Sequence, residues 1–526
     1  MQRTAAQILR IALGKPCGNE ILSAFDPSSA VRYNLAVNSS QSMSPKEEHK
    51  SLHRILGPWD GIAVTIGIVI GLGIFRTPGL VAQHLGSPDL VLLAWALGGL
   101  YALAASLTFA ELSTLFPQAG GHYTYIQRAY GNYVGFLSGW TDSLSYIGAT
   151  ASIAVVFGEY LGLLAEYGAG GVKVVAASAL LALAAINWIG LRWGSAAQNI
   201  FSLAKIVALS SVVIASFALG GGPSASASTL PAINAPGSAA QLIIAFGLAM
   251  QGVFWTYHGW AGVAKLSEEV RDPGRNLPRV LVGGVIGVIA IYLLINIAFL
   301  YVLPIDRIAA SKLVAADVAD ELFGPRGGQI ITALALVSIF GGLNANILQT
   351  PRIFFAMARD GLTFNLFTRV NSGGTPTAAL FVTISVSVML ALTNSFESLL
   401  ATTLFMAILN DLLAFLSVYI FRRRLPEAPR PYRAPGYPWL PLFSVAIASA
   451  FLLHILYGEL SSLLVALKQI RQGLSLESFQ GLLRSLPASI LLVALSYPAY
   501  RLWLRFAAPG DRVGGMVEAA ARREVL

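Results

Sequence analysis

Residues 64–78 read Val64-Thr-Ile-Gly67-Ile-Val-Ile-Gly71-Leu72-Gly73-Ile-Phe-Arg-Thr-Pro78, an apolar run that three glycines and a proline interrupt. Such a run makes a poor continuous helix, because glycine weakens a helix interior and proline breaks it. A break at this depth of a membrane is tolerated only where the freed backbone groups line a cavity or meet a ligand. The simpler explanation is that Gly67 and Gly71 let two helices pack closely. Taken alone, the segment favours this packing explanation.

A second apolar segment is interrupted in the same way, at Val253-Phe-Trp255-Thr256-Tyr257-His258-Gly259-Trp260-Ala-Gly262. The apolar residues 241–254 precede this cluster, which therefore lies near the centre of a membrane span rather than at its interface. Two Gly-interrupted segments, each opening one half of a ten-helix unit, point to the binding site of an inverted-repeat transporter. Broken helices offer N–H groups to a carboxylate and carbonyls to an ammonium, so the pair predicts a site for a zwitterion.

The composition is that of a membrane protein: of 526 residues, 55% are hydrophobic and 12% are charged, against roughly 25% charged residues in soluble domains. Twelve segments are long and apolar enough to cross a bilayer. The net charge of +9 lies in short loops between these segments, which indicates topology rather than nucleic-acid binding. The predicted spans are 60–82, 90–116, 134–164, 172–188, 196–219, 241–266, 279–303, 329–357, 377–392, 399–421, 440–457 and 487–504.

Lysines and arginines concentrate in the loops on one side, which places both termini inside the cell, with the plasma (inner) membrane as the expected location. Residues 1–50 are expected to be a disordered cytoplasmic tail, with Met43 as an alternative start. Residues 51–425 form the ten-helix core, 426–507 two further helices, and 508–526 a second cytoplasmic tail. An outer connection holds one helical stretch, 308–322, and 458–486 is expected to lie as an amphipathic segment on the membrane surface.

The chain resembles the amino acid–polyamine–organocation superfamily, and within it the L-type amino acid transporters and their bacterial relatives. The resemblance extends in family order from about residue 58 to 438. The motifs that carry it are Gly71-Leu-Gly-Ile-Phe-Arg-Thr-Pro78, Phe109-Ala-Glu111-Leu-Ser-Thr-Leu-Phe-Pro117-Gln-Ala-Gly-Gly121-His-Tyr-Thr-Tyr, Trp255-Thr-Tyr-His-Gly-Trp260, Glu268-Glu-Val-Arg-Asp-Pro273-Gly-Arg-Asn-Leu-Pro278-Arg, Arg422-Arg-Arg-Leu-Pro426 and Arg430-Pro-Tyr-Arg433.

This resemblance implies an all-α, LeuT-type fold of five plus five inverted helices, with two more at the C-terminal end. It implies that the backbone at Gly71, Leu72 and Gly73 binds the substrate carboxylate, while carbonyls around Val69, Ile70 and Trp255 bind the amine. By the same resemblance, Trp255 is expected to be the aromatic gate over the substrate, with the rest of the break completing the site. The chain departs from many relatives at Leu72, where they have serine, and at His258, where they have a small residue. The remaining residues expected at the site are Thr256, Tyr257 and Gly259.

Ionisable residues inside the spans are few and are functional candidates by default. By resemblance, Lys205 stands where sodium-coupled relatives bind an ion, with Ser338 as a candidate partner. Two roles stay open for it: a proton carrier, or a structural ammonium that ties the fifth span to carbonyls of the first. Glu111 is expected to pair with inner-loop arginines. Asp411 is expected to face a watery inner vestibule, with a proton site as the alternative.

Several protein classes are excluded or disfavoured. The chain has no G-x-S-x-G, H-E-x-x-H or G-x-x-x-x-G-K-[ST] motif, which argues against an enzyme and against ATP-driven transport. No cofactor or metal is expected. The single cysteine, Cys17, excludes an internal disulfide, and no disulfide-linked heavy subunit is expected.

The sequence thus predicts a sodium-independent secondary transporter of neutral L-amino acids that works by exchange or with protons, with the amino acid and the lipid bilayer as its partners. A cationic amino acid or polyamine carrier is the alternative within the family. That alternative ranks lower because neither broken segment supplies a carboxylate. A non-transporting membrane sensor or channel is more remote, since the spans offer no ring of polar residues.

Overall fold

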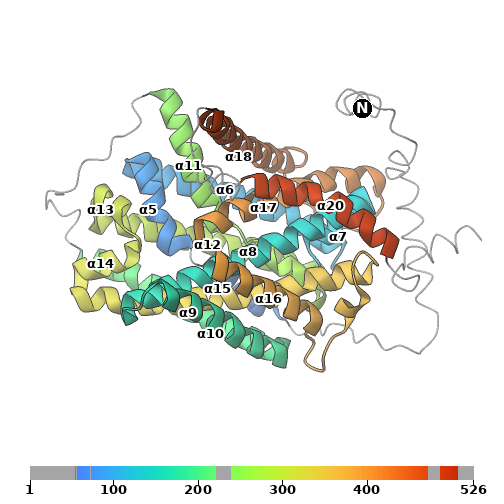
Figure 1. The fold of residues 1–526 in the computed structure, drawn as a ribbon, viewed down its shortest axis with the longest axis horizontal. Coiled ribbons are helices and arrows are strands. Elements are labelled where there is room, and N and C mark those ends of the chain that lie inside the picture. Colours follow the sequence, from blue (N-terminus) through green and yellow to red (C-terminus); the bar gives the residue numbers. More distant parts are fainter. Residues whose placement is uncertain are drawn as a thin grey trace, which may run out of the picture.

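The computed structural model describes residues 54, 56–71, 73–220, 238–394, 396–471 and 486–506. In these ranges the chain is helical, and the only strand-like pairings are two isolated bridges, between Leu56 and Val270 and between Val370 and Pro376. Most of the long helices run side by side along the longest dimension of the molecule (Figure 1). The predicted tails 1–50 and 508–526, as well as Leu72, lie outside the described residues.

All twelve predicted segments are helical. Among the described residues, nine helices are long and apolar enough to cross a membrane, or ten if the bent pair α4 and α5 forms one span. The helices that match the predicted segments are α4 (Pro58–Val69) with α5 (Gly73–Leu85), α6 (Pro88–Leu115), α8 (Asn132–Ala165), α9 (Ala169–Ile189), α10 (Leu191–Leu219), α11 (Ala239–Tyr257) with the 3-10 helix η2 (Gly262–Glu269), α12 (Pro273–Val302), α15 (Pro325–Arg359), α16 (Thr377–Thr393), α17 (Phe396–Arg424), α18 (Trp439–Arg471) and α20 (Leu486–Phe506).

The connections differ from prediction in two places. A short helix that the sequence analysis did not predict, α7 (His122–Tyr130), follows α6. The single helix expected at 308–322 is two helices, α13 (Ile305–Ala310) and α14 (Val314–Phe323). They separate at Ser311, whose side-chain oxygen accepts a hydrogen bond from the backbone N–H of Leu313 at 3.1 Å. A serine side chain that bonds the local backbone competes with helical hydrogen bonds, which explains the break.

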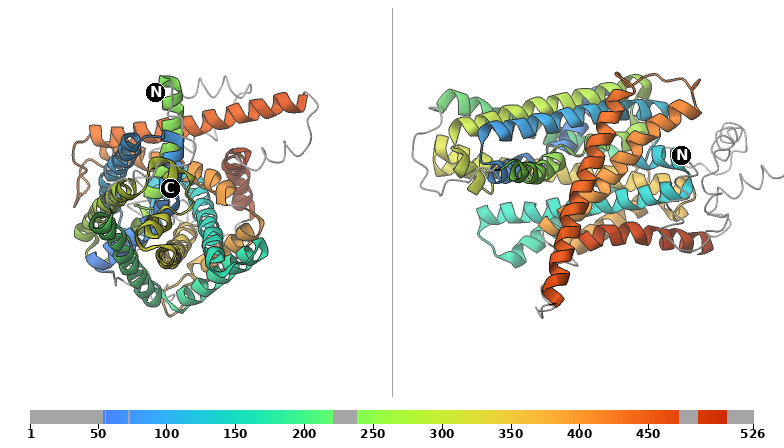
Figure 2. Two further views of the ribbon diagram at one scale, coloured as in Figure 1. Left: turned by 90° about the vertical axis from the view of Figure 1, so that its left-hand side faces the viewer. Right: turned by 90° about the horizontal axis from the view of Figure 1, so that it is seen from above.

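Helix α18 continues past the predicted end of its span. It extends unbroken to Arg471, so the first part of the expected surface segment 458–486 belongs to this helix. Residues 459–471 contain neither glycine nor proline, and their leucines, single alanine and lysine favour helix. Figure 2 shows α18 crossing the outside of the bundle obliquely. Residues 472–485 lie outside the described ranges.

Helix α10 shows how the apolar spans divide between lipid and interior. One of its faces is exposed in the isolated chain and mainly apolar, as expected for a surface that meets lipid. The opposite face is buried, and it includes the only lysine of this helix, Lys205. The exposed residues are Ile200, Leu203, Val207 and Ile214, and the buried ones are Ser202, Lys205, Leu209, Val212 and Ser216.

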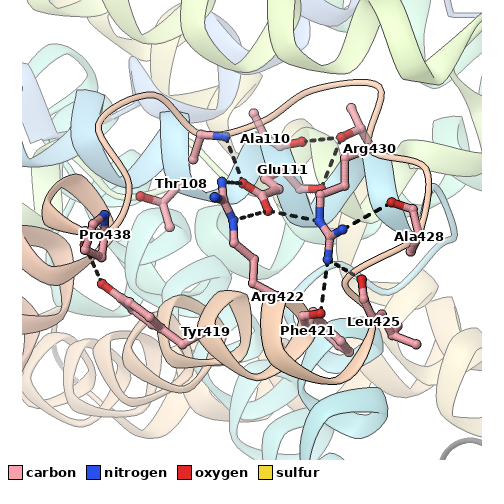
Figure 3. Close-up of polar contacts among 12 residues, drawn as sticks. Thr108, Ala110, Glu111, Tyr419, Phe421, Arg422, Leu425, Ala428, Arg430 and Pro438 are labelled. Atoms are coloured by element: carbon pink, nitrogen blue, oxygen red, sulfur yellow. Dashed lines mark hydrogen bonds and ion pairs between the residues drawn. The ribbon is translucent and has the colours of Figure 1, made fainter.

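Glu111, near the end of α6, joins the first part of the chain to the segment that follows α17 (Figure 3). Its buried carboxylate accepts hydrogen bonds from Arg422 Nε at 2.9 Å and Arg422 Nη2 at 2.6 Å, and from the backbone N–H of Ala434 at 2.8 Å. Arg430 Nε lies 3.4 Å from the same carboxylate. The expected pairing of Glu111 with these arginines is therefore confirmed, and its role is structural.

Candidate functional site

The first predicted break is present. Helix α4 ends at Val69, Ile70 leaves the helical conformation with ψ of 79°, and α5 begins at Gly73 at an angle of 42° to α4. The N–H of Gly71 turns back to donate to the carbonyl of Val69 at 2.8 Å. The first N–H groups of α5 have no acceptor within their own helix, and they carry the positive end of its dipole. A helix start of this kind favours an anion.

The second break is also present. Helix α11 ends at Tyr257, after which His258 is extended and Gly259 has φ of +110°, a conformation that strongly favours glycine. The N–H of His258 donates to the carbonyls of Phe254 at 2.8 Å and Trp255 at 3.2 Å, which caps the helix. The chain then resumes as η2 at Gly262.

The two breaks lie against each other. A Cβ on Gly259 would stand 2.7 Å from a methyl group of Ile68, and one on Gly73 would stand 2.7 Å from the side chain of Thr256. Tyr292 of α12 links the two helix ends, since its hydroxyl lies 2.8 Å from the carbonyl of Val69 and 3.2 Å from that of Thr256. These contacts require glycine at both positions and place the two interruptions in one site.

Gly71 differs from these packed glycines. A Cβ on Gly71 would come no closer than 3.9 Å to any other described atom, which is ordinary van der Waals contact. The Cα of Gly71 faces Gly342 of α15, where a Cβ would lie 3.5 Å away. Gly71 therefore has room for a small group on one side, although the residue is buried. This room lies where the sequence predicts the substrate carboxylate.

The carbonyls predicted to bind the amine already accept hydrogen bonds. The carbonyl of Ile70 accepts one from Lys205 and that of Trp255 one from His258 N–H, whereas that of Val69 accepts two, from the Tyr292 hydroxyl and from Gly71 N–H. A carbonyl oxygen has two lone pairs, so the oxygens of Ile70 and Trp255 retain the capacity for a second donor and that of Val69 does not.

Two of the predicted site side chains serve helix packing instead. The hydroxyl of Thr256 donates to Thr77 at 2.8 Å. Tyr257 packs against the rings of Trp95 and Tyr292, and its hydroxyl donates to the carbonyl of Trp95 at 3.2 Å. Thr256 and Tyr257 could therefore contribute to a substrate site only through their backbone atoms.

Lys205 is fully buried, and its ammonium donates to the carbonyl of Gly67 at 2.8 Å and to that of Ile70 at 2.7 Å. Both oxygens belong to the end of α4, where the helix dipole favours a cation. The lysine therefore ties α10 to the first break. The predicted contact with Ser338 is absent: Ser338 Oγ is buried and has no hydrogen-bond partner within the described part of the chain.

The structure adds a polar cluster that sequence reasoning missed. Asp411 of α17 is fully buried, so the expectation of a watery vestibule around it is wrong. Its Oδ1 lies 2.8 Å from Nε2 of His122, and its Oδ2 lies 3.8 Å from Nε2 of His258. These residues are 289 and 153 positions apart, and no spacing rule joins them. The single available signal was an acid in the middle of an apolar span.

Beside this cluster lies a buried ion pair between Lys265 of η2 and Asp142 of α8, with Nζ 3.3 Å from Oδ2. The same ammonium sits over the ring of Tyr146 at 4.1 Å from its centroid. This pair was not predicted from the sequence, although Lys265 lies inside the predicted span 241–266 and Asp142 inside the predicted span 134–164.

A second set of polar contacts joins η2 to the end of α15. Arg352 pairs with Glu269 at 3.1 Å in the interior, and Arg359 bonds Glu268 nearer the surface. Tyr123 of α7 donates to Asp360 at 2.8 Å, and burial raises the pKa of the Asp360 carboxyl. By the predicted topology these ion pairs lie on the inner side of the site.

Two broken helices that meet inside a bundle of apolar helices are typical of one class, the integral, multi-pass membrane transporters. The chain belongs to the amino acid permease family, whose model matches residues 56–466.

Individual relatives agree with this assignment. The serine/threonine exchanger SteT of Bacillus subtilis is 34% identical over 404 residues, which cover 76% of this chain and 90% of the relative. The human b(0,+)-type amino acid transporter 1 is 30% identical over 406 residues, covering 76% and 81%. The mouse large neutral amino acids transporter small subunit 2 is 29% identical over 425 residues, covering 76% and 78%.

Proposed function

We propose that this protein is a sodium-independent exchanger of neutral L-amino acids that binds its substrate where the breaks of α4–α5 and α11–η2 meet. The observation that carries the proposal is that the two breaks meet, through the contacts of Gly73 with Thr256 and of Gly259 with Ile68, so that the N-terminus of α5 lies near the C-terminal ends of α4 and α11. A carboxylate suits the first of these helix ends and an ammonium the other two.

Sodium independence rests on Lys205. Its ammonium is buried against the carbonyls of Gly67 and Ile70, at the end of the first broken helix. Backbone carbonyls of an unwound helix are the ligands that coordinate sodium in transporters of this architecture. A fixed ammonium on these oxygens supplies the positive charge that a bound sodium ion would otherwise bring.

The preference for neutral substrates rests on the charges around the breaks. The second break carries the imidazole of His258, and the Asp411 carboxylate lies 2.8 Å from His122 and 3.8 Å from His258. The names of two relatives also favour neutral substrates, since one is a serine/threonine exchanger and the other a large neutral amino acids transporter subunit.

A cationic substrate is the second candidate, favoured by one observation: the carboxylate of Asp411 lies behind His258, 3.8 Å from its ring. A lysine or arginine side chain that displaced His258 would meet this charge. Transport of neither class, with the protein intact in the membrane, would point instead to the more remote role of a sensor or channel.

We infer that the protein resides in the plasma membrane with both termini in the cytoplasm, because its basic residues gather in the loops on one side. Its only cysteine, Cys17, lies in the segment assigned to the inner side. The transporter therefore works without a disulfide-linked heavy subunit.

The test is counterflow with the purified protein in liposomes. Vesicles loaded with one unlabelled amino acid are diluted into the same labelled compound, in choline buffer without sodium. We expect accumulation of serine, threonine or leucine and little of lysine. Accumulation of lysine alone would favour the second candidate, and accumulation that requires sodium would contradict the role assigned to Lys205.

The variant His258→Gly is expected to broaden the set of accepted amino acids toward bulkier side chains. The His258 ring follows directly after α11 in the second break and is partly exposed, so its removal should enlarge a site at the breaks. Counterflow rates across a panel of neutral amino acids measure the effect. The control is His454→Ala on α18, where the ring packs at Gly247 away from the breaks. An unchanged panel in His258→Gly would show that this ring points away from the substrate.

A further inference from the structure

In the cluster of Asp411, His122 and His258, two buried polar atoms have no hydrogen-bond partner within the described residues. The side chains of Asp411 and His122 are 0% and 2% exposed, and only that of His258, at 19%, is in part accessible. One carboxylate oxygen, Oδ1, bonds His122, whereas Oδ2 has no hydrogen-bond partner within the described residues. Nδ1 of His122 likewise has none there. A buried carboxylate oxygen without a donor is costly, so the cluster has capacity for a proton.

Among the described residues, no unpaired cation nearby offsets the negative charge of the Asp411 carboxylate. The nearest cation, Lys265, is already paired with Asp142 at 3.3 Å, and these two charges cancel. The other titratable groups that face Asp411 are the phenols Tyr101 of α6 and Tyr146 of α8, which are neutral. With both histidines neutral, Asp411 would be a buried net negative charge. One proton, held on the carboxyl or on either imidazole, makes the cluster neutral.

The position of the cluster connects this proton to the transport cycle. His258 belongs to the break after α11, His122 to the start of α7 and Asp411 to the middle of α17. Trp260, two residues after His258, stacks on Phe415 of the same α17 at a centroid distance of 6.1 Å. Any movement of the break relative to α17 therefore changes the 3.8 Å separation between His258 and Asp411.

We propose that Asp411, His122 and His258 form a proton-binding site that takes up one proton with each amino acid on one side of the membrane and releases it on the other. The inference rests on the proposed function and adds proton-coupled net uptake to exchange. His258 is the route between the substrate site and the buried Asp411 carboxyl. Balanced exchange of one amino acid for another moves no net proton, because each inward proton is matched by an outward one.

A metal ion does not explain the cluster. Within the part of the chain that the structure describes, no group of three or more His, Cys, Asp or Glu side chains has the arrangement of a metal site. The longer of the two contacts, at 3.8 Å, is beyond hydrogen-bond distance. A ligand as small as a proton fits this spacing.

The experiment compares net uptake with counterflow in the same proteoliposomes. Empty vesicles with a trapped pH-sensitive dye are placed in a more acidic buffer, and labelled amino acid is added. In wild type we expect the lumen to acidify when amino acid is added. A gradient of about one pH unit should support an accumulation of about tenfold, since one unit is a tenfold difference in proton activity.

The variant Asp411→Asn keeps the volume of the side chain but replaces the carboxyl group, which can bind a proton, with an amide, which cannot. It should lose the acidification and the gradient-driven accumulation while its counterflow stays within twofold of wild type. Asp317→Asn on α14, outside the breaks, is the matched control and should behave like wild type. If Asp411→Asn does not reach the membrane, His122→Gln provides the same readout, because it removes the other end of the 2.8 Å contact.

Three results would overturn the proposal. The first is a wild-type protein that catalyses counterflow but shows neither acidification of the lumen nor gradient-driven accumulation during net uptake into empty vesicles, which leaves the proposed exchange function standing. The second is proton movement that persists in Asp411→Asn or His122→Gln. The third is an Asp411→Asn variant that changes its choice of amino acid and keeps its proton movement, which would assign the carboxylate to the substrate side chain. Absence of counterflow in wild type would instead refute the proposed function itself.

Discussion

Replacement of Lys205 by methionine or alanine is expected to abolish amino acid transport while most of the protein still folds and reaches the membrane. The ammonium is the donor for the carbonyls of Gly67 and Ile70, and both would be left without it. An unsatisfied buried acceptor costs about 1–3 kcal/mol, so the end of α4 should loosen and the first break should lose its shape. Counterflow of labelled serine or leucine, per molecule of folded protein, measures the loss.

The two Lys205 variants separate charge from volume. Methionine fills nearly the same space as lysine without a donor, whereas alanine also leaves a cavity beside Gly341, whose Cβ would lie 3.1 Å from the lysine chain. If methionine restored full counterflow, the space-filling role of Lys205 would matter and its ammonium would not. Recovery of either variant by added sodium would show that the cation site can be refilled, in support of the role assigned to the lysine.

Valine at Gly71 and valine at Gly73 are expected to fail for different reasons. A Cβ at Gly71 meets nothing closer than 3.9 Å, so Gly71→Val should fold normally and lose uptake because its side chain occupies the substrate's place. A Cβ at Gly73 would stand 2.9 Å from the backbone of Thr256. Overpacking of this kind typically costs about 1–3 kcal/mol, so Gly73→Val should lower the melting temperature by disturbing the contact of α5 with α11.

Thermal unfolding in detergent, measured beside counterflow, distinguishes the two glycines. We expect Gly71→Val to melt within a degree or two of wild type with no counterflow, and Gly73→Val to melt several degrees lower. Wild-type transport by Gly71→Val would remove the basis for a substrate site at this glycine. Equal losses of stability in both variants would show that Gly71 is a packing residue as well.

The breaks in the helices could be predicted from the sequence because glycine and proline mark them directly. Gly71, Gly73 and Gly259 stand at the interruptions, and the last of these has a positive φ. The end of α18 could not be predicted in the same way, because nothing near Gly458 stops a helix of good helix formers. The division of 308–322 into α13 and α14 depends on a local serine contact that hydropathy does not register.

The site could be predicted only in part. The partners of Lys205 on α4 agree with the structural alternative that the sequence left open, while Ser338 was chosen by family position and does not contact it. Asp411, His122 and His258 come from three distant segments, and their meeting depends on how α17 and α7 pack against the second break. The pairing of Lys265 with Asp142 depends on the same packing.

The central claim is that an amino acid binds where the two breaks meet, and a structure determined with a transported amino acid bound tests it most directly. The account predicts the substrate carboxylate at the first N–H groups of α5, beside Gly71. It predicts the ammonium at the carbonyls of Ile70 and Trp255, with the substrate side chain toward His258. A substrate bound elsewhere in the bundle, or bound with its ammonium at the start of α5, would contradict the account.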